Sequence, residues 1–399
     1  MRIAFLAPCD PKDKRALSTC MYYMGQALEK HCEVYYCDPI ISFEKWFGRL
    51  IDAVSRRLFK KNIAYDRLLL AAKKHGKIAA QRLGGRSFHA IVAIMNPLDV
   101  AFLETDIPIA LVLDATFALQ HDYHPQYSNL WNWSAHQANK VEEIAYQKAK
   151  VLLYSSYWAA RSAIEDYAVD QQKVHTIFFG ANLDTIPSRE MVLAKKKSER
   201  CRLLFMAARW ESKGGPIAFE TLLKLEEMGI EAELIICGMT PPSEFAHERM
   251  VVIPFLDKND ERQSKEIEKL YAMSNFLLLP TRVDCTPHVF NEANAFGVPV
   301  ITTDTGGVPD MVRNGENGYV LPYSARGSEY ARIIAEIYQD DQRYTALVES
   351  SRDAFESRMN WDTWGSAVKQ VLQSITDGTP LDRKVEGENL REIVQEIGS

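Results

Sequence analysis

Long apolar runs and an excess of basic charge are both missing from this sequence. No apolar stretch in the 399 residues reaches the ~18 residues that a membrane-spanning helix needs, so we expect no transmembrane segment. Residues 3–8 are apolar, but this stretch is short and charged residues follow at once, which favours a buried first strand over a secretory signal. The net charge is -6, so we expect no nucleic-acid partner.

Cysteine is sparse and unpatterned. The seven cysteines are odd in number and scattered, and the nearest two in sequence are Cys32 and Cys37. This distribution fits neither a disulfide framework nor the paired spacing of a zinc site. We therefore expect a protein of the reducing cytoplasm.

Three cofactor-binding motifs are missing as well. No Gly-x-Gly-x-x-Gly follows a strand, which argues against a dehydrogenase, although dehydrogenases also use Rossmann domains. The Walker phosphate-binding loop is missing, which argues against an ATPase or kinase of that type. No Asp-x-Asp stands where it would hold a metal ion. We expect neither a cofactor nor a required metal.

What the sequence does contain is an alternation of short apolar runs with helical patterns. Continuous apolar runs are typical of strands buried on both faces, and alternation with helices predicts parallel sheets. The predicted strands are Ile3–Ala7, Val34–Cys37, Ala90–Met95, Ile107–Leu113, Val151–Tyr154, Val174–Phe178, Leu203–Ala207, Leu234–Cys237, Val251–Pro254, Phe276–Leu279 and Val298–Thr302.

The alternation stops between residues 185 and 201, where we predict a linker. Two doubly wound domains in tandem follow, an N-terminal one over 1–185 and a C-terminal one over 201–364. Apolar residues recur at helical spacing beyond Trp361, so we expect a final helix over 365–399 that packs back on the first domain.

The segment 280–300 carries the strongest indication of a ligand site. It follows a predicted strand, and loops at the carboxyl ends of parallel strands bind ligands. A helix begins near Pro287–Val289, and its free N–H groups form an anion site suited to a diphosphate. Asp284 and Glu292 supply carboxylates for hydroxyl groups. The alternative is an N-cap and an exposed helix glutamate, common on any surface.

A second segment, Ala208–Gly215, places two cations at a strand-to-helix turn. Arg209 can chelate phosphate oxygens with two N–H groups, while Lys213 acts as a point charge. On its own, a turn with two basic residues is usually exposed to solvent and binds no ligand.

Together the two segments resemble glycosyltransferase family 4. The matching patterns are Asp284-x7-Glu292 followed by Ala-x-Ala-Phe-Gly-Val-Pro-Val-Ile, and Arg209-x3-Lys213-Gly. Turns at 303–310 and 314–318 also resemble the family, and they support the fold more than a site. The chain departs from the family where Asp284 replaces the usual Glu and Cys-Thr-Pro-His replaces a glycine-rich loop.

The resemblance implies an α/β GT-B fold, with two Rossmann-like doubly wound parallel-sheet domains facing a cleft, and a retaining mechanism. It implies that Glu292 binds the nucleotide ribose, that Asp284 lies near the donor sugar, and that Arg209 and Lys213 stabilise the departing diphosphate. The C-terminal domain would bind the donor and the N-terminal domain the acceptor. The donor-binding candidates in the loop are Cys285, Thr286, Pro287, His288 and Val289.

The same resemblance suggests acceptor-side residues in the N-terminal domain. Asp114 follows a predicted strand where many relatives have His, and we expect it to contact the sugar or the acceptor. Ser18 and Thr19 lie in a loop without glycine, and a helix N-cap is their alternative. The acceptor-side candidates are Ser18, Thr19, His121, His124 and Ser155.

We therefore expect a hexosyltransferase that acts on a nucleotide diphosphate-sugar, with UDP-glucose as the expected donor. The acceptor would be a glycan, a polysaccharide or a lipid-linked saccharide. Two cations at the diphosphate would replace a metal ion. The alternatives are an inactive GT-B partner or regulatory protein, a phosphorylase or sugar-nucleotide epimerase of the same fold, and, more distantly, an oxidoreductase.

One stretch departs from the acidity of the whole. Residues 44–86 contain 12 Lys or Arg and 3 Asp or Glu, and apolar residues recur there at helical spacing. A basic amphipathic helix can lie on an anionic bilayer, so one interpretation is peripheral contact with the inner membrane face through 43–86. The alternative is a surface helix packed on its own domain with its charges solvated.

Overall fold

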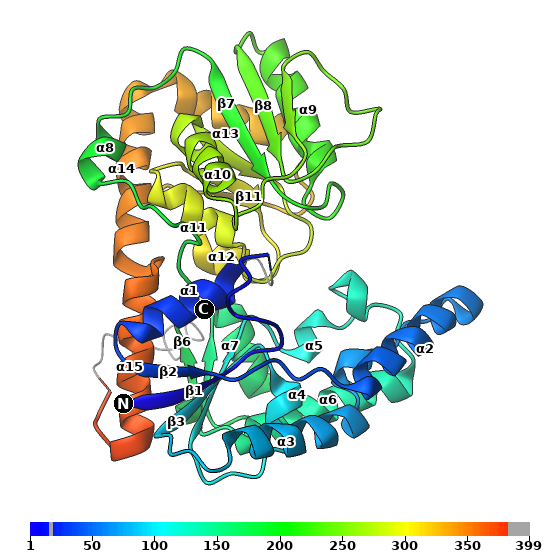
Figure 1. Ribbon diagram of the computed structural model, residues 1–399. Coiled ribbons are helices and arrows are strands. Elements are labelled where there is room, and N and C mark those ends of the chain that lie inside the picture. Colours follow the sequence, from blue (N-terminus) through cyan, green and yellow to red (C-terminus); the bar gives the residue numbers. More distant parts are fainter. Residues whose placement is uncertain (16–18, 382–399) are drawn as a thin grey trace. The chain divides into compact units, whose positions relative to one another are not determined.

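The computed structural model describes residues 1–15 and 19–381, and Figure 1 labels its helices and strands. The described residues form two compact units. Unit 1 contains residues 1–15, 21–178 and 364–381, and unit 2 contains residues 19–20 and 179–363. Each unit is built around its own sheet and its own hydrophobic core.

The described part of unit 1 has a six-stranded sheet in the order β2-β1-β3-β4-β5-β6, and all neighbouring strands are parallel. β3, β4 and β5 are buried at every position, as expected for strands covered by helices on both faces. The strands are β1 (Arg2–Leu6), β2 (Glu33–Tyr36), β3 (Ala90–Ile94), β4 (Ile109–Leu113), β5 (Val151–Tyr154) and β6 (Val174–Thr176).

Helices connect these strands, and α3, α4 and α6 pack against one another beside the sheet (Figure 1). The helices are α1 (Cys20–Glu29), α2 (Phe43–Phe59), α3 (Leu69–Leu83), α4 (Pro97–Val100), α5 (Phe117–Gln120), α6 (Asn132–Lys148) and α7 (Tyr157–Glu165). The chain returns to unit 1 at its far end through α15 (Trp361–Asp377), which belongs to this unit from Trp364 onward.

Unit 2 repeats the architecture with the strand order β12-β11-β10-β7-β8-β9, again all parallel. Its strands are β7 (Cys201–Met206), β8 (Ala232–Cys237), β9 (Met250–Ile253), β10 (Phe276–Leu279), β11 (Val300–Thr303) and β12 (Gly318–Leu321). From β7 the chain continues outward through β8 and β9, and it then crosses to the other side of β7 to form β10. The loops after β7 and β10 therefore lie next to each other at the carboxyl edge of the sheet, where α/β sheets bind ligands.

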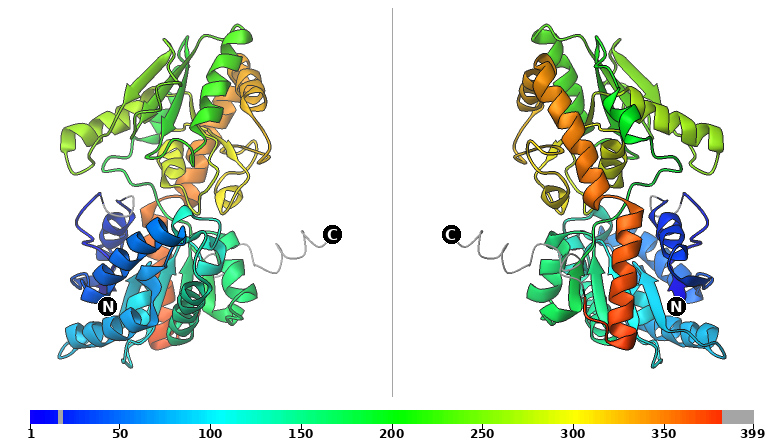
Figure 2. Two further views of the ribbon diagram at one scale, coloured as in Figure 1. Left: turned by 90° about the vertical axis from the view of Figure 1, so that its right-hand side faces the viewer. Right: turned by 90° about the vertical axis from the view of Figure 1, so that its left-hand side faces the viewer.

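In unit 2, α9 and α13 pack together, and Figure 2 shows helices on both sides of the strands in each unit. The helices of unit 2 are α8 (Arg189–Leu193), α9 (Gly215–Glu227), α10 (Glu261–Met273), α11 (His288–Ala295), α12 (Val308–Met311), α13 (Gly327–Gln339) and α14 (Asp341–Arg358). None of the described helices is both long and apolar enough to cross a bilayer.

The predicted fold class is confirmed, and all eleven predicted strands are present within two residues at either end. β12 was not predicted, because Gly318 had been assigned to a turn and only three residues follow it in the strand. The segment predicted as a linker, 185–201, contains the short helix α8, which is capped by the Ser188 hydroxyl. The last predicted helix ends at Asp377, and residues 382–399 lie outside the described chain.

Candidate functional site

The turn between β7 and α9 carries Arg209 and Lys213 at the carboxyl end of a central strand of unit 2. Gly214 has φ +76°, and a Cβ there would lie 1.9 Å from the carbonyl oxygen of Pro280. The turn can therefore pack against the end of β10 only with glycine at this position. Arg209 is exposed, and Lys213 is half-buried.

Lys213 connects this turn to the loop after β10. Its ammonium forms an ion pair with the carboxylate of Asp284 and donates a hydrogen bond to the carbonyl oxygen of Val283 (3.1 Å). The backbone N–H of Arg282 donates to the carbonyl oxygen of Ser212 (2.9 Å). The cationic turn and the acidic loop, which the sequence presents 70 residues apart, thus form one cluster.

The N-terminus of α11 lies in the same loop. The helix begins at His288 after Pro287, whose side chain provides no cap hydrogen bond. The first N–H groups of the helix, with the positive end of its dipole, are suited to an anion. Thr286 and Pro287 are buried, whereas Cys285 and Val289 are half-buried.

Glu292 lies one turn into α11 and is only 2% exposed, which excludes the exposed-glutamate alternative. Its Oε1 accepts a hydrogen bond from the Lys258 ammonium (2.7 Å), and its Oε2 accepts one from the Tyr271 phenol (2.7 Å). Burial, with the nearby carboxylate, raises the pKa of Tyr271, so the phenol stays protonated and keeps donating. Lys258 also donates to the carbonyl oxygen of Asn182 (2.9 Å).

Sequence reasoning missed Lys258 and Tyr271 as partners of Glu292. Lys258 follows β9 and so stands, like Lys213, in a loop at a strand's carboxyl end, which is the signal that could have found it.

His288 is held in an aromatic stack. Its ring lies 5.6 Å from that of Phe179 at an interplanar angle of 4°, and 6.3 Å from that of Trp361. Burial lowers the pKa of His288 below its usual value, so the ring is neutral at neutral pH. Within the described chain, its Nδ1 is buried without a hydrogen-bond partner.

In unit 1, Asp114 and Ser155 lie side by side. They directly follow β4 and β5, whose last residues Leu113 and Tyr154 are paired in register. The backbone N–H of Ser155 donates to the carbonyl oxygen of Leu113 (3.1 Å). Asp114 is half-buried and Ser155 is fully buried, so of the two the carboxylate is the more accessible.

The segment after Asp114 is fixed by a buried glutamate that sequence reasoning also missed. Glu142 on α6 forms an ion pair with Arg67 and accepts a hydrogen bond from the backbone N–H of Phe117 (2.7 Å). Arg67 in turn donates to the side chain of Gln120 (2.8 Å). These contacts hold α5 in place directly after the predicted acceptor-side residue.

Of the other acceptor-side candidates, His121 and His124 also lie in unit 1, whereas Thr19 belongs to unit 2. His121 stacks on Phe117 at 5.6 Å, and the Nδ1 of His124 accepts from the backbone N–H of Gln126 (3.3 Å), which caps a 3₁₀ turn. Thr19 is buried at φ +68°, which is not the extended conformation of an N-cap residue. Ser18 lies outside the described residues.

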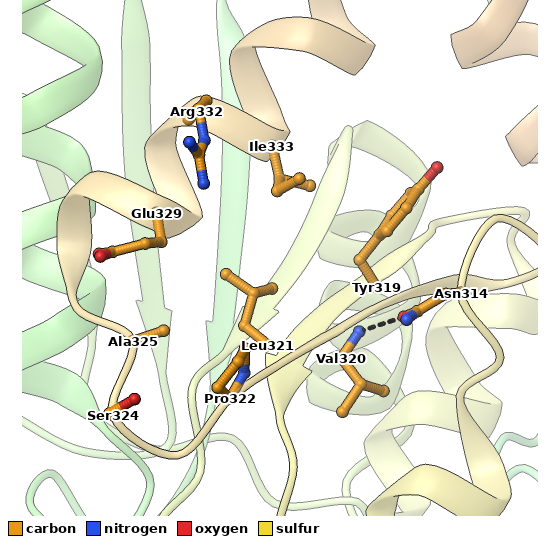
Figure 3. Close-up of a pocket in the computed structure, with 10 residues that line it drawn as sticks. All are labelled: Asn314, Tyr319, Val320, Leu321, Pro322, Ser324, Ala325, Glu329, Arg332 and Ile333. Atoms are coloured by element: carbon orange, nitrogen blue, oxygen red, sulfur yellow. Dashed lines mark hydrogen bonds between the residues drawn. The ribbon is translucent and has the colours of Figure 1, made fainter.

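Figure 3 shows a pocket of about 370 Å³ in unit 2, away from all of these residues. It lies between β12 and α13, and the Asn314 side chain at its rim accepts from the backbone N–H of Val320 (2.7 Å). Glu329 in its lining is used to cap α13. None of the predicted site residues lines this pocket. Among the residues that the structure describes, no group of three or more His, Cys, Asp or Glu side chains is arranged to hold a metal ion.

Two known proteins of related sequence match parts of the chain. The putative colanic acid biosynthesis glycosyltransferase WcaL of Escherichia coli is 20% identical over 254 residues, 60% of each chain. A GDP-mannose-dependent alpha-(1-6)-phosphatidylinositol monomannoside mannosyltransferase of Mycobacterium tuberculosis is 28% identical over 115 residues, 27% of this chain and 30% of that protein. The chain thus spans 60% or less of the length of these relatives.

The structure is also similar to solved ones. That of Anabaena Alr3699/HepE in complex with UDP has a TM-score of 0.63 at 15% identity and covers 94% of this chain and 100% of that chain. The same protein in complex with UDP-glucose gives a TM-score of 0.60. These neighbours show the GT-B fold. Residues 192–354 match the family model described as Glycosyl transferases group 1, and they include Arg209, Lys213, Asp284 and Glu292. The cluster of Lys213, Asp284 and Glu292 therefore lies within the segment that matches this family model, in a chain of the GT-B fold.

Proposed function

We propose that this protein is a retaining glycosyltransferase of family 4 that transfers a hexose from a nucleotide diphosphate-sugar. The observation that carries the proposal is the contact of Lys213 with Asp284 beside the N-terminus of α11, inside the matched family domain. In this proposal unit 2 binds the donor through that cluster, and unit 1 binds the acceptor beside Asp114.

The chemistry follows from the charges. The bond between the anomeric carbon and the β-phosphate oxygen breaks, and its electron pair goes to the leaving diphosphate. An acceptor hydroxyl oxygen forms the new bond to the anomeric carbon, and its proton goes to the departing diphosphate. Lys213, Arg209 and the first N–H groups of α11 stabilise the growing negative charge without a metal ion, because these positive groups are already in place.

The two ion pairs of the cluster prepare the residues for this donor. Lys213 is neutralised by Asp284, and a diphosphate would offer its ammonium a second, more highly charged partner. Glu292 is fixed by Lys258 and Tyr271, and its carboxylate retains acceptor capacity for the ribose hydroxyls. The buried Nδ1 of His288 would gain a partner from the bound donor.

For the donor we propose UDP-glucose. The UDP-glucose complex of the Anabaena structural neighbour supports this choice, whereas the mycobacterial relative uses GDP-mannose. The acceptor we propose is a glycan, a polysaccharide or a lipid-linked saccharide, in keeping with the name of the E. coli relative.

The test is donor hydrolysis without acceptor over UDP-, GDP- and ADP-sugars, first with EDTA and then with a divalent metal ion in excess of EDTA, with the released nucleotide identified by mass spectrometry. We expect one donor to be cleaved, and the rate to fall at least about 100-fold in Lys213→Ala. The control is Lys265→Ala, which removes an exposed lysine of the same unit that pairs with Glu261 (2.6 Å). A Lys213→Ala protein as active as the control would reject the leaving-group role, and cleavage only after metal addition would reject the metal-free mechanism.

A further inference from the structure

The helix α2 of unit 1 is amphipathic with its polar face inward. Its packed side consists of Gly48, Asp52 and Ser55, which are buried. Its solvent side is a continuous stripe of large apolar side chains, each 42% to 66% exposed: Phe43, Trp46, Phe47, Leu50, Ile51, Val54 and Leu58. A helix that only covers its own domain buries such a stripe, so this one is arranged for another contact.

Specific polar contacts fix this orientation. The Asp52 carboxylate accepts a hydrogen bond from the backbone N–H of Ile63 (2.7 Å). The Ser55 hydroxyl donates to the carbonyl oxygen of Lys61 (2.7 Å) and accepts from the indole N–H of Trp131 (2.8 Å). Rotating the stripe inward would break these bonds and bury unpaired polar groups, which is costly.

Close packing at Gly48 and the buried side chains of Ser42, His75 and Asp99 fix the first half of the helix. A Cβ at Gly48 would lie 2.9 Å from that of Tyr65, so the helix closely approaches the 3₁₀ turn formed by Tyr65–Arg67. Ser42, just before the helix, has its hydroxyl 2.9 Å from the Nε2 of His75, whose Nδ1 lies 2.6 Å from Asp99. These three side chains are buried, so they act as an anchor.

The charge around the stripe is positive although the protein is acidic. Residues 43–61 contain six Lys or Arg and two acidic residues, a net charge of +4 in a chain of -6. Arg49, Arg56 and Arg57 are exposed along the helix, and Lys60 is exposed just beyond its end. An apolar face bordered by cations is complementary to a surface that is anionic outside and apolar beneath.

We propose that α2 docks this protein on an anionic lipid bilayer. The helix, about 25 Å long, lies in the plane of the surface. Its apolar stripe enters the boundary between headgroups and acyl chains, and its arginines contact lipid phosphates. A second copy of the chain fits this face poorly, because pairing two α2 helices would bring two net charges of +4 together. Docking through α2 does not depend on the proposed catalytic activity.

Co-flotation of the full chain with vesicles tests the docking. The vesicles are phosphatidylcholine alone, or phosphatidylcholine mixed with phosphatidylglycerol. We expect binding to the mixed vesicles that weakens as salt is added. The double variant Leu50→Glu with Val54→Glu should lose it, because both residues are exposed and the change affects the stripe without disturbing the core.

A matched control replaces two apolar residues of unit 2 that are at least about as exposed, Met191→Glu with Met228→Glu, and should bind as the unchanged protein does. A charge variant, Arg49→Gln with Arg57→Gln, keeps the stripe and should weaken binding to the anionic vesicles roughly tenfold or more.

A fluorescence measurement places the helix itself in the bilayer. Lipids brominated on their acyl chains should quench the protein's tryptophan emission, and Trp46→Phe should remove most of that quenching. Failure of the unchanged protein to bind anionic vesicles, or binding that survives Leu50→Glu with Val54→Glu, would overturn the proposal. So would a stable dimer in solution that this double variant dissociates, since the stripe would then be occupied by a second copy.

Discussion

At the residue scale, the buried pair of Lys258 and Glu292 makes the proposed donor site sensitive to the loss of a single charge. The Lys258 ammonium neutralises a carboxylate that is 2% exposed. Removing the cation alone leaves that carboxylate buried and uncompensated, and such changes are strongly destabilising. The pair therefore contributes to stability as well as to the shape of the site.

We predict that Lys258→Met lowers the free energy of unfolding by about 3 kcal/mol. The double variant Lys258→Met with Glu292→Gln should recover part of the loss, because the buried charge is then removed. Urea denaturation of both proteins is the measurement. Lys265→Met, which breaks only an exposed pair, is the control and should change stability by less than about 1 kcal/mol. Equal effects at Lys258 and Lys265 would contradict this account.

Lys195 gives a prediction about pH. Burial, reinforced by the nearby Arg202, lowers the pKa of its ammonium to about 8, and the group donates to the carbonyl oxygen of Ser274 (2.5 Å). In the unfolded chain the pKa is about 10.4, so the unfolded state binds this proton more tightly. Stability should therefore rise with pH between those two values, and this contribution should be constant below pH 8.

The measurement compares the unchanged protein with Lys195→Met across that pH range. The free energy of unfolding of the unchanged protein should rise relative to the variant by up to about 1.4 kcal/mol per pH unit. The other titrating groups are common to both proteins and cancel in the difference. Parallel curves throughout the range would show that the ammonium is not destabilised by folding.

At the element scale, the turn between β7 and α9 depends on a single glycine. Gly214→Ala would place a methyl group 1.9 Å from the Pro280 carbonyl oxygen at φ +76°. Gly229 offers a matched control, because its φ is +73° but nothing lies within 4 Å of its added Cβ. Gly229→Ala should therefore lower the free energy of unfolding only through the strain of a left-handed alanine, about 1–2 kcal/mol.

We predict that Gly214→Ala costs at least twice as much free energy of unfolding as Gly229→Ala. It should also reduce donor turnover, since the turn must move and carries Lys213 with it. Denaturation and donor hydrolysis on the two variants measure both effects. Equal stability losses would mean that the turn relaxes without cost and that the close approach is not required.

Most elements were predictable because their signal is local. β3 and β10 are continuous apolar runs, as strands covered on both faces must be. The shared site of Lys213 and Asp284 was predictable from the family patterns, and topology explains it, because β7 and β10 are neighbours. The position of Lys258 after β9 could have placed it at the same edge of the sheet, but its pairing with Glu292 depends on tertiary packing that the sequence pattern does not contain.

The orientation of α2 shows a second limit of sequence reasoning. Periodicity predicted an amphipathic helix there and left open whether its apolar face packs on the protein or on a membrane. The structure decides which face is turned inward through contacts of Asp52 and Ser55 that no periodic pattern contains. Polar residues on a helix are ordinarily assigned to solvent, and here they form the packed side.

At the scale of the whole molecule, unit 1 is discontinuous in sequence. Its core includes side chains of α15 that are fully buried although almost 200 residues separate them from the rest of the unit. These residues are Trp364, Val368, Val371 and Leu372. A Cβ at Gly365 would lie 2.8 Å from the carbonyl oxygen of Ala27, so this helix also approaches α1 closely.

We predict that a chain ending at residue 363 loses the native packing of unit 1, whereas a chain ending at residue 381 keeps it. Hydrogen exchange is the measurement, because it reports each unit separately. Protection of the β1 and β3 amides should collapse in the shorter chain, and protection of β7 and β10 should persist. Unchanged protection in β1 would show that the unit is complete without α15.

The return of α15 to unit 1 also sets an order of events during synthesis. Unit 2 is almost continuous and is complete once residue 363 has been made, whereas unit 1 must wait for the helix that follows. At translation rates of about 5–20 residues per second, residues 1–178 would remain without their closing helix for roughly 10 to 40 s. The part of the chain that is made first is therefore the part that finishes folding last, and it is exposed to chaperones and proteases in that interval.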